Sequence, residues 1–383
     1  MLLYVAHISR AYAQAVRCFE VITAALAEAG AELRHVVRTR MFVTDIDRRT
    51  VEARVSADLP RAILTIGAAY DRSEGATDYR SESAFGPFDA SARFDRANRG
   101  LFAQLLADPV DRLDLTLGAR LDHNDAFGTF ETWRAGASFR LLDHTRLRGG
   151  FGIGFREPTF GETYGSGFGD RGNPDLHPER SRSAELGLEH QLAGGHVRIA
   201  ATAFHQRFED LIQYTFTAPG EINYFNVGAA RSAGFELTAE ANRGRLSLAA
   251  GYTHVATRVL DPGLATDASF VEGQPLLRRP AHSGSLATRW RLDRGVIGLT
   301  LGLVGEREDV DYSADFPYPR VSLPPFATLD LAAEHDLPGR AGDLARVLFR
   351  AENLADAAYE TVHGFPAPGR LVHVGVRIVA GGK

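Results

Sequence analysis

The sequence predicts an all-β protein: an antiparallel transmembrane β-barrel, partial, of about 15 strands, preceded by a small N-terminal α/β fragment. From residue 51 onward, segments of roughly ten residues alternate apolar and polar side chains. The connectors between these segments are alternately very short and long. The polar face of successive strands carries Arg and Asp. Such side chains are excluded from contact with lipid but are tolerated in the water-filled lumen of a barrel.

Composition limits the classes of protein to which this chain can belong. The 383 residues carry a net charge of −5, so the sequence does not predict a basic surface that binds nucleic acid. No run of 18 apolar residues occurs, so no transmembrane helix is predicted. Cys18, Met1 and Met41 all lie in the first 50 residues, which supports a junction near residue 50. The start of the chain lacks a basic region and a cleavage site, so no signal peptide is predicted.

Residues 1–50 predict a helix over about 10–29 and a strand near 36–46. Val16, Phe19, Ile22 and Leu26 form the apolar stripe of that helix. The stretches 24–33 (AALAEAGAEL) and 37–46 (VRTRMFVTDI) resemble the Rid family of enamine and imine deaminases. The resemblance implies a helix–strand fragment too small to bury a core alone, and we expect it to stay outside the barrel wall.

Residues 51–383 contain the strands. The alternation places them near 51–57, 62–71, 97–107, 112–122, 132–141, 146–155, 182–191, 196–206, 231–241, 245–255, 283–292, 296–306, 326–336, 346–354 and 371–379. Long connectors are expected near 72–96, 123–131, 156–181, 207–230, 256–282, 307–325 and 355–370. The remaining connectors are short turns rich in Gly, Pro, Asp and Asn, so one end of the barrel carries the long loops.

Ordered motifs in this region resemble the C-terminal part of a TonB-dependent outer-membrane receptor of the cobalamin and siderophore type. They are FREPTFGETY at 155–164, GNPDLHPERS at 172–181, YFNVG at 224–228, GFE at 234–236, RPAH at 279–282, AENLAD at 351–356 and PGR at 368–370.

The resemblance implies a barrel of about 22 strands with a plugged lumen, of which this chain holds roughly the last two-thirds. It implies uptake of a metal chelate or cobalamin across the outer membrane of a Gram-negative cell, with outer-membrane lipid and that ligand as partners. The plug and the TonB box are absent from the residues that show the resemblance, so contact with TonB is not expected.

Aromatic and acidic residues on the expected extracellular loops are the candidate substrate-binding residues, because receptor loops hold ligands with such side chains. They are Tyr79, Phe85, Tyr164, Phe168, Tyr224, Phe225, Asp309, Asp311, Tyr312, Phe316 and Phe365. Asp175, His177 and Glu179 resemble a metal cluster, but two prolines hold this stretch extended, so no metal site is predicted.

The sequence does not predict an enzyme. No Ser/His/Asp or Cys/His arrangement has supporting context, and the glycine-rich stretch 150–154 lies within a strand, so no cofactor is expected. Three alternatives remain open at this stage. They are a plug-free porin-like barrel, a non-functional fusion of two fragments, and a Rid-type deaminase.

Overall fold

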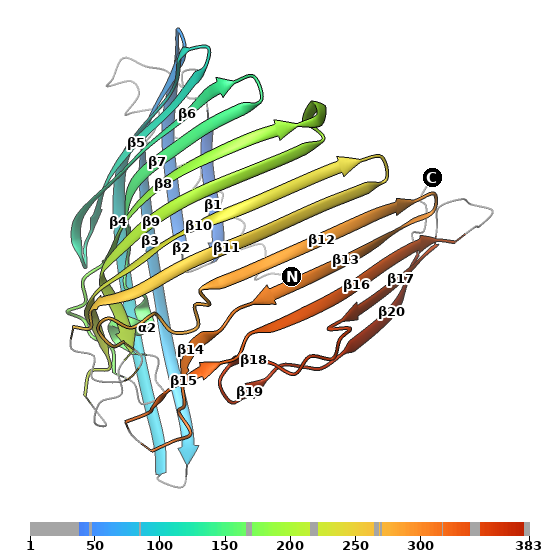
Figure 1. Ribbon diagram of the computed structural model, residues 1–383. Coiled ribbons are helices and arrows are strands. Elements are labelled where there is room, and N and C mark those ends of the chain that lie inside the picture. Colours follow the sequence, from blue (N-terminus) through green and yellow to red (C-terminus); the bar gives the residue numbers. More distant parts are fainter. Residues whose placement is uncertain are drawn as a thin grey trace. The chain divides into compact units, whose positions relative to one another are not determined.

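The computed structural model describes residues 38–45, 48–83, 86–165, 171–214, 221–263, 268, 270–315, 317–337 and 345–378 (Figure 1). The helix expected over 10–29 lies outside these residues. The chain forms two compact units. The first comprises residues 1–139, 150–182 and 209–227, and the second comprises residues 140–149, 183–208 and 228–383.

The first unit contains a meander of antiparallel strands in chain order. These strands are β1 (Arg38–Asp45), β2 (Arg48–Leu59), β3 (Ala62–Ser83), β4 (Gly86–Val110), β5 (Leu113–Asn124) and most of β6 (Gly128–Leu142). A short helix, α2 (Phe160–Tyr164), also belongs to this unit. Four further strands have residues in both units. They are β7 (Thr145–Arg156), β8 (Glu179–Leu192), β9 (Val197–Tyr214) and β10 (Tyr224–Arg243).

The second unit continues the same pattern, with the pairing order β10–β11–β12–β13–β16–β17–β20. The new strands are β11 (Leu246–Asp261), β12 (His282–Leu292), β13 (Gly295–Val304), β16 (Phe326–Asp336), β17 (Ala345–Glu352) and β20 (Leu371–Ile378). Two small hairpins lie within connectors. They are β14 (Arg307–Val310) with β15 (Arg320–Leu323), and β18 (Glu360–Val362) with β19 (Phe365–Pro366).

All fifteen strands that alternation predicts from residue 51 onward are present, within a few residues of the expected positions except where strands extend into connectors. The largest difference concerns residues 72–96, which were expected as a long connector. They extend β3 and β4, which pair without interruption from Ala62↔Ala107 to Ser83↔Gly86. Arg72 forms an ion pair with Asp95 across this hairpin, at 2.5 Å between Nη2 and Oδ2. Polar cross-strand pairs of this kind lengthen a hairpin beyond its apolar part.

The segment before residue 48 requires a correction. The strand expected near 36–46 is present as β1, but it does not stay outside the sheet, because it pairs antiparallel with β2 from Arg38↔Arg54 to Asp45↔Arg48. The physical reason is the open edge of β2, whose unpaired N–H and C=O groups accept an extended segment of suitable length.

The two faces of the strands match the predicted alternation. Leu117 and Leu121 of β5 are 45% and 48% exposed, whereas Asp122, the residue after Leu121, is 2% exposed. On β20, Val374 and Ile378 are 71% and 74% exposed. Large apolar side chains therefore cover one face of the strands, here called the apolar face, and the opposite polar face carries the charges. No helix among the described residues is long and apolar enough to cross a membrane.

Candidate functional site

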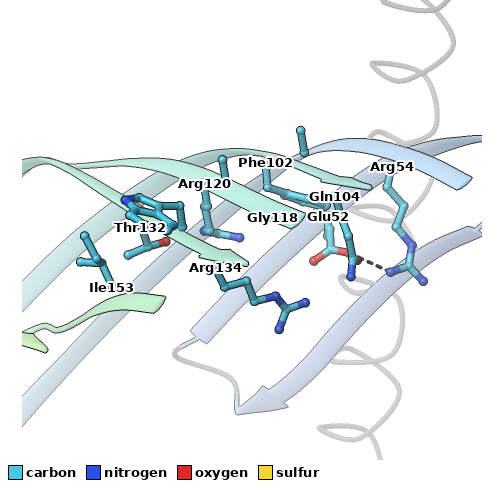
Figure 2. Close-up of a pocket in the computed structure, with 12 residues that line it drawn as sticks. Glu52, Arg54, Phe102, Gln104, Gly118, Arg120, Thr132, Arg134 and Ile153 are labelled. Atoms are coloured by element: carbon cyan, nitrogen blue, oxygen red, sulfur yellow. Dashed lines mark ion pairs between the residues drawn. The ribbon is translucent and has the colours of Figure 1, made fainter. Parts of the chain in front are cut away.

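The polar face of the first unit contains a hollow of about 380 Å³ over β2, β4, β5 and β6 (Figure 2). Glu52 and Arg54 of β2, Arg120 of β5 and Arg134 of β6 contribute charged side chains to it. A second hollow of about 310 Å³ shares Glu52 and Arg120 with the first, so the two adjoin. Cross-strand pairing runs from Arg54 of β2 through Gly67 of β3 and Phe102 of β4 to Arg120 of β5. Residues paired in such a row share one face, which is why the charges lie on one side of the sheet.

A salt bridge between Arg120 and Asp122 lies where the hollows adjoin. The Arg120 Nε and Nη2 atoms lie 2.6 and 2.7 Å from the two Asp122 oxygens, and Asn98 also donates to Asp122 at 2.8 Å. Gly100 permits this approach, because a Cβ atom there would lie 2.3 Å from Arg120 Nη2. These three side chains hold each other in place, so the Arg120 guanidinium is fixed at the surface of the hollow.

Other lining cations have weaker partners. Arg54 lies 3.9 Å from the Glu52 carboxylate, beyond hydrogen-bond distance. Arg134 makes no ion pair with any residue that the structure describes. Together the two hollows are lined by five arginines and three carboxylates, Glu52, Asp71 and Glu157. The excess of guanidinium groups can attract and orient an anionic ligand.

At the long-loop end of the same unit, aromatic rings stack beside another arginine. The rings of Phe94 and Phe160 lie 4.0 Å apart, and the ring of Tyr164 lies 6.1 Å from Phe94. The Arg96 guanidinium lies 4.4 Å from the centre of the Phe160 ring and pairs with Glu157 at 3.3 Å. Tyr164 is 42% exposed. The group therefore combines a cation with flat apolar surface, which suits an aromatic, negatively charged ligand.

Arg156, at the end of β7, joins two of the ordered motifs. Its guanidinium makes two 2.6 Å hydrogen bonds to Glu179 and two longer ones to Glu162 of α2. Thr159 and Glu162 form a reciprocal capping box at the start of α2. Burial opposes ionisation of Glu162, but the hydrogen bonds from Arg156 and Thr159 outweigh it, so the pKa of Glu162 is lowered. The FREPTF motif thus fixes the helix that carries Tyr164.

The NPDLHPER stretch has a structural role. Asn226 accepts a hydrogen bond from the His177 amide at 2.8 Å and donates to the His177 carbonyl at the same distance. Asn173 donates to the Tyr224 carbonyl at 2.9 Å. Tyr224 packs edge-on against Tyr214 at 5.3 Å, and Phe225 follows it in β10, half-buried. Tyr224 and Phe225 therefore lie where the GNPDLHPERS and YFNVG motifs meet.

In the second unit, Asp309 joins three connectors. Its carboxylate has no exposed surface and accepts hydrogen bonds from Arg278 Nε at 2.8 Å, the Val310 amide at 2.9 Å and the His363 amide at 2.7 Å. Burial opposes ionisation, but these three donors outweigh it and lower the pKa of Asp309. Its oxygens are already occupied within the protein, which gives this candidate residue a role in holding the loops.

Arg307 reinforces the same connectors. It is 5% exposed, donates to the carbonyls of Pro324 and Glu360, and lies 5.2 Å from the centre of the Phe326 ring. Phe326 in turn stacks on Tyr359 at 4.1 Å. We call Arg307, Asp309 and their partners in these loops the loop cluster.

The remaining candidate residues of the second unit lie beside the loop cluster. Asp311 accepts hydrogen bonds from Ser313, which lower the pKa of Asp311. Tyr312 is 59% exposed and Phe365, at the tip of the β18–β19 hairpin, is 71% exposed. Exposed aromatic residues next to a fixed cluster are suited to ligand contact.

Three candidate residues, Phe85, Phe168 and Phe316, lie outside the described residues, and Tyr79 lies in β3 within a stretch whose side chains are not described. Sequence reasoning did not select Arg54, Arg96, Arg120 or Arg134 as site residues. The available signal was the recurrence of arginine at polar-face positions of β2, β4, β5 and β6. Among the described residues, no group of three His, Cys, Asp or Glu side chains is placed to hold a metal ion.

Solved structures share this fold. The FrpB iron transporter from Neisseria meningitidis is 15% identical with a TM-score of 0.66, and the similarity covers 86% of this chain and 54% of that one. The ferric-catecholate import receptor Fiu from E. coli K12 is 14% identical with a TM-score of 0.69, covering 91% and 58%. The siderophore receptor PirA from Acinetobacter baumannii is 16% identical with a TM-score of 0.65, covering 86% and 54%.

The chain thus spans little more than half the length of these receptors. The sequence itself matches the family described as "TonB dependent receptor-like, beta-barrel" over residues 13–354. Receptors of this family are outer-membrane transporters and not enzymes. With that match extending over most of its length, the chain belongs to the family of TonB-dependent receptor β-barrels.

Proposed function

We propose that this chain is the barrel part of an outer-membrane receptor that takes up an anionic metal chelate. The observation that carries the proposal is the arginine-rich hollow on the polar face, lined by Arg54, Arg120 and Arg134. Iron chelates built from catecholates are negatively charged and present flat aromatic rings, and they match both this hollow and the stack of Phe94, Phe160 and Tyr164.

Cobalamin is the competing ligand. Its periphery is dominated by neutral amides, which gain little from an excess of guanidinium groups. The names of similar structures, an iron transporter and two siderophore or ferric-catecholate receptors, also favour an iron chelate. We therefore assign the chelate as the ligand and cobalamin as the alternative.

Energy coupling belongs to the whole receptor. We propose that residues 51–383 provide the wall and loops, and that the contact with TonB is made by a plug of the kind found in the family. Residues 1–50 are proposed as a separate segment whose strand β1 supplements the edge of β2.

A binding measurement tests the ligand assignment. The full chain, refolded in detergent, is dialysed against a radiolabelled ferric catecholate or against labelled cyanocobalamin. The double variant Arg54→Gln/Arg134→Gln should weaken chelate binding about tenfold, because two ligand-facing charges are lost. Arg112→Gln, in the exposed β4–β5 turn, serves as the matched control and should bind like the wild type. Binding of cobalamin in preference to the chelate would reject the assignment.

A further inference from the structure

The apolar face of the second unit contains a groove of about 460 Å³ at the long-loop end of β11, β12, β13 and β16. A cross-strand row of residues explains it. Gly284 lies directly opposite Tyr252 on one side and Leu303 on the other, and Leu303 lies opposite Ala327. Residues in such a row stand side by side on one face. Gly284 and Ala327 are small, so a groove remains beside the side chains of Tyr252 and Leu303, which are 38% and 46% exposed.

The neighbouring rows define the ends of the groove. Toward the middle of the strands, Leu286 lies between Ala250 and Leu301, so bulky apolar side chains follow. Toward the loops, His254 lies directly opposite His282. The groove is therefore apolar along its length and polar at the end near the loops.

The polar end is built from two imidazoles and a phenol. The rings of His254 and His282 are 4.7 Å apart, and Tyr252 Oη lies 2.7 Å from His282 Nδ1. The Nδ1 atom of His254 is buried without a hydrogen-bond partner among the described residues. Imidazole N–H groups donate hydrogen bonds to phosphate oxygens, so two imidazoles side by side suit an anionic head group.

We infer that this groove binds one acyl chain of a phosphate-bearing membrane lipid, with the phosphate beside His254 and His282. The groove is continuous with the apolar face, whose exposed residues Leu237, Leu286 and Leu303 contact lipid in an outer-membrane barrel. Its histidine end lies beside the long loops, at the level where an apolar strand face gives way to head groups. The apolar groove thus suits the acyl chain, and the histidine end of the same site suits the phosphate.

Larger side chains in the groove should block binding of the acyl chain. Gly284 has ordinary backbone angles, and a Cβ atom there would meet its nearest neighbour, the Gly251 carbonyl, at 3.5 Å, so a leucine fits without backbone strain. Gly284→Leu fills the groove from below, and Ala327→Leu fills it from the side. Ala333→Leu is the matched control, because it lies six residues further along the same face of β16 and outside the groove.

Native mass spectrometry of the full chain, refolded in detergent and titrated with dimyristoylphosphatidylglycerol or dimyristoylphosphatidylcholine, measures the site. We expect one phosphatidylglycerol bound in preference to phosphatidylcholine, at least about tenfold weaker binding in Gly284→Leu and Ala327→Leu, and unchanged binding in Ala333→Leu. His282→Phe should keep a bound lipid but lose the preference for the anionic head group.

Heat-dependent gel mobility verifies that each variant has folded. Two filled-groove variants guard against the failure of one to fold. Wild-type binding by both of them, or an equal loss in Ala333→Leu, would overturn the inference. Equal affinity of the wild type for the two lipids would overturn the role of the histidines. None of these outcomes depends on transport of a chelate.

Discussion

The carboxylate of Asp309 allows a quantitative test of how the loops are held. One oxygen accepts from Arg278 and from the Val310 amide, and the other accepts from the His363 amide. In Asp309→Asn, one of these oxygens becomes an NH2 group that faces a donor. Hydrogen bonds to a charged group contribute about 1.5–3 kcal/mol each, and burial prevents water from replacing them. We therefore expect local destabilisation of about 2–3 kcal/mol.

Amide hydrogen exchange measures this loss directly. A local opening that is easier by about 2–3 kcal/mol speeds exchange of the His363 amide roughly 30- to 150-fold. Peptides from within the strands β11, β12 and β13 should exchange as in the wild type, because they lie outside the three connectors. Asp315→Asn is the matched control, because that carboxylate is exposed in the same connector and makes no ion pair with any residue that the structure describes. A change of less than about threefold at His363 would contradict the reasoning.

Acidification should reproduce the substitution. The pKa of Asp309 is lowered in the folded protein, so its stabilising contribution is complete above the unfolded-state pKa and is lost as pH falls through the folded pKa. Protection of the His363 amide, corrected for the intrinsic exchange rate, should therefore decrease in wild type below the usual carboxyl range. The Asp309→Asn variant should lack this dependence.

Three further outcomes are expected. Leu115→Arg should impair insertion into lipid vesicles by about 2–4 kcal/mol while Thr116→Arg does not, and equal effects would reject the assigned faces. The lowered pKa of Glu162 means that its carboxylate stabilises the folded protein above that pKa and that this stabilisation is lost as pH falls through it. Proteolysis near α2 should therefore become faster in acid in the wild type, and Glu162→Gln should remove this dependence on pH. Deleting residues 1–47 should expose the edge of β2 and increase aggregation on refolding; an unchanged yield of monomer would show that β1 contributes nothing there.

The strands and their faces could be predicted from the sequence because the period of two is a local property. Leu117 and Arg120 face opposite ways in any strand that contains both. The loop cluster could not be predicted, because Asp309 meets partners 31 and 54 residues away along the chain. The same limit applies to the stack of Phe94 and Phe160, whose alignment depends on a hairpin longer than the alternation indicates.

The N-terminal strand illustrates a different limit. Its extended character follows from residues 36–46, and β1 confirms it. Its pairing with β2 does not follow from those residues, because an open sheet edge selects a neighbour mainly through backbone hydrogen bonds.

The loop cluster has a consequence for how these loops diversify. Arg307 and Asp309 belong to one connector, yet their partners Arg278, Glu360 and His363 belong to the two flanking ones. A chimaera that exchanges a single loop would bury donors and acceptors without counterparts, so recombination should succeed only when the three segments are transferred together. Variation in these connectors is consequently expected at exposed positions such as Tyr312 and Phe365, which lie outside this common anchor.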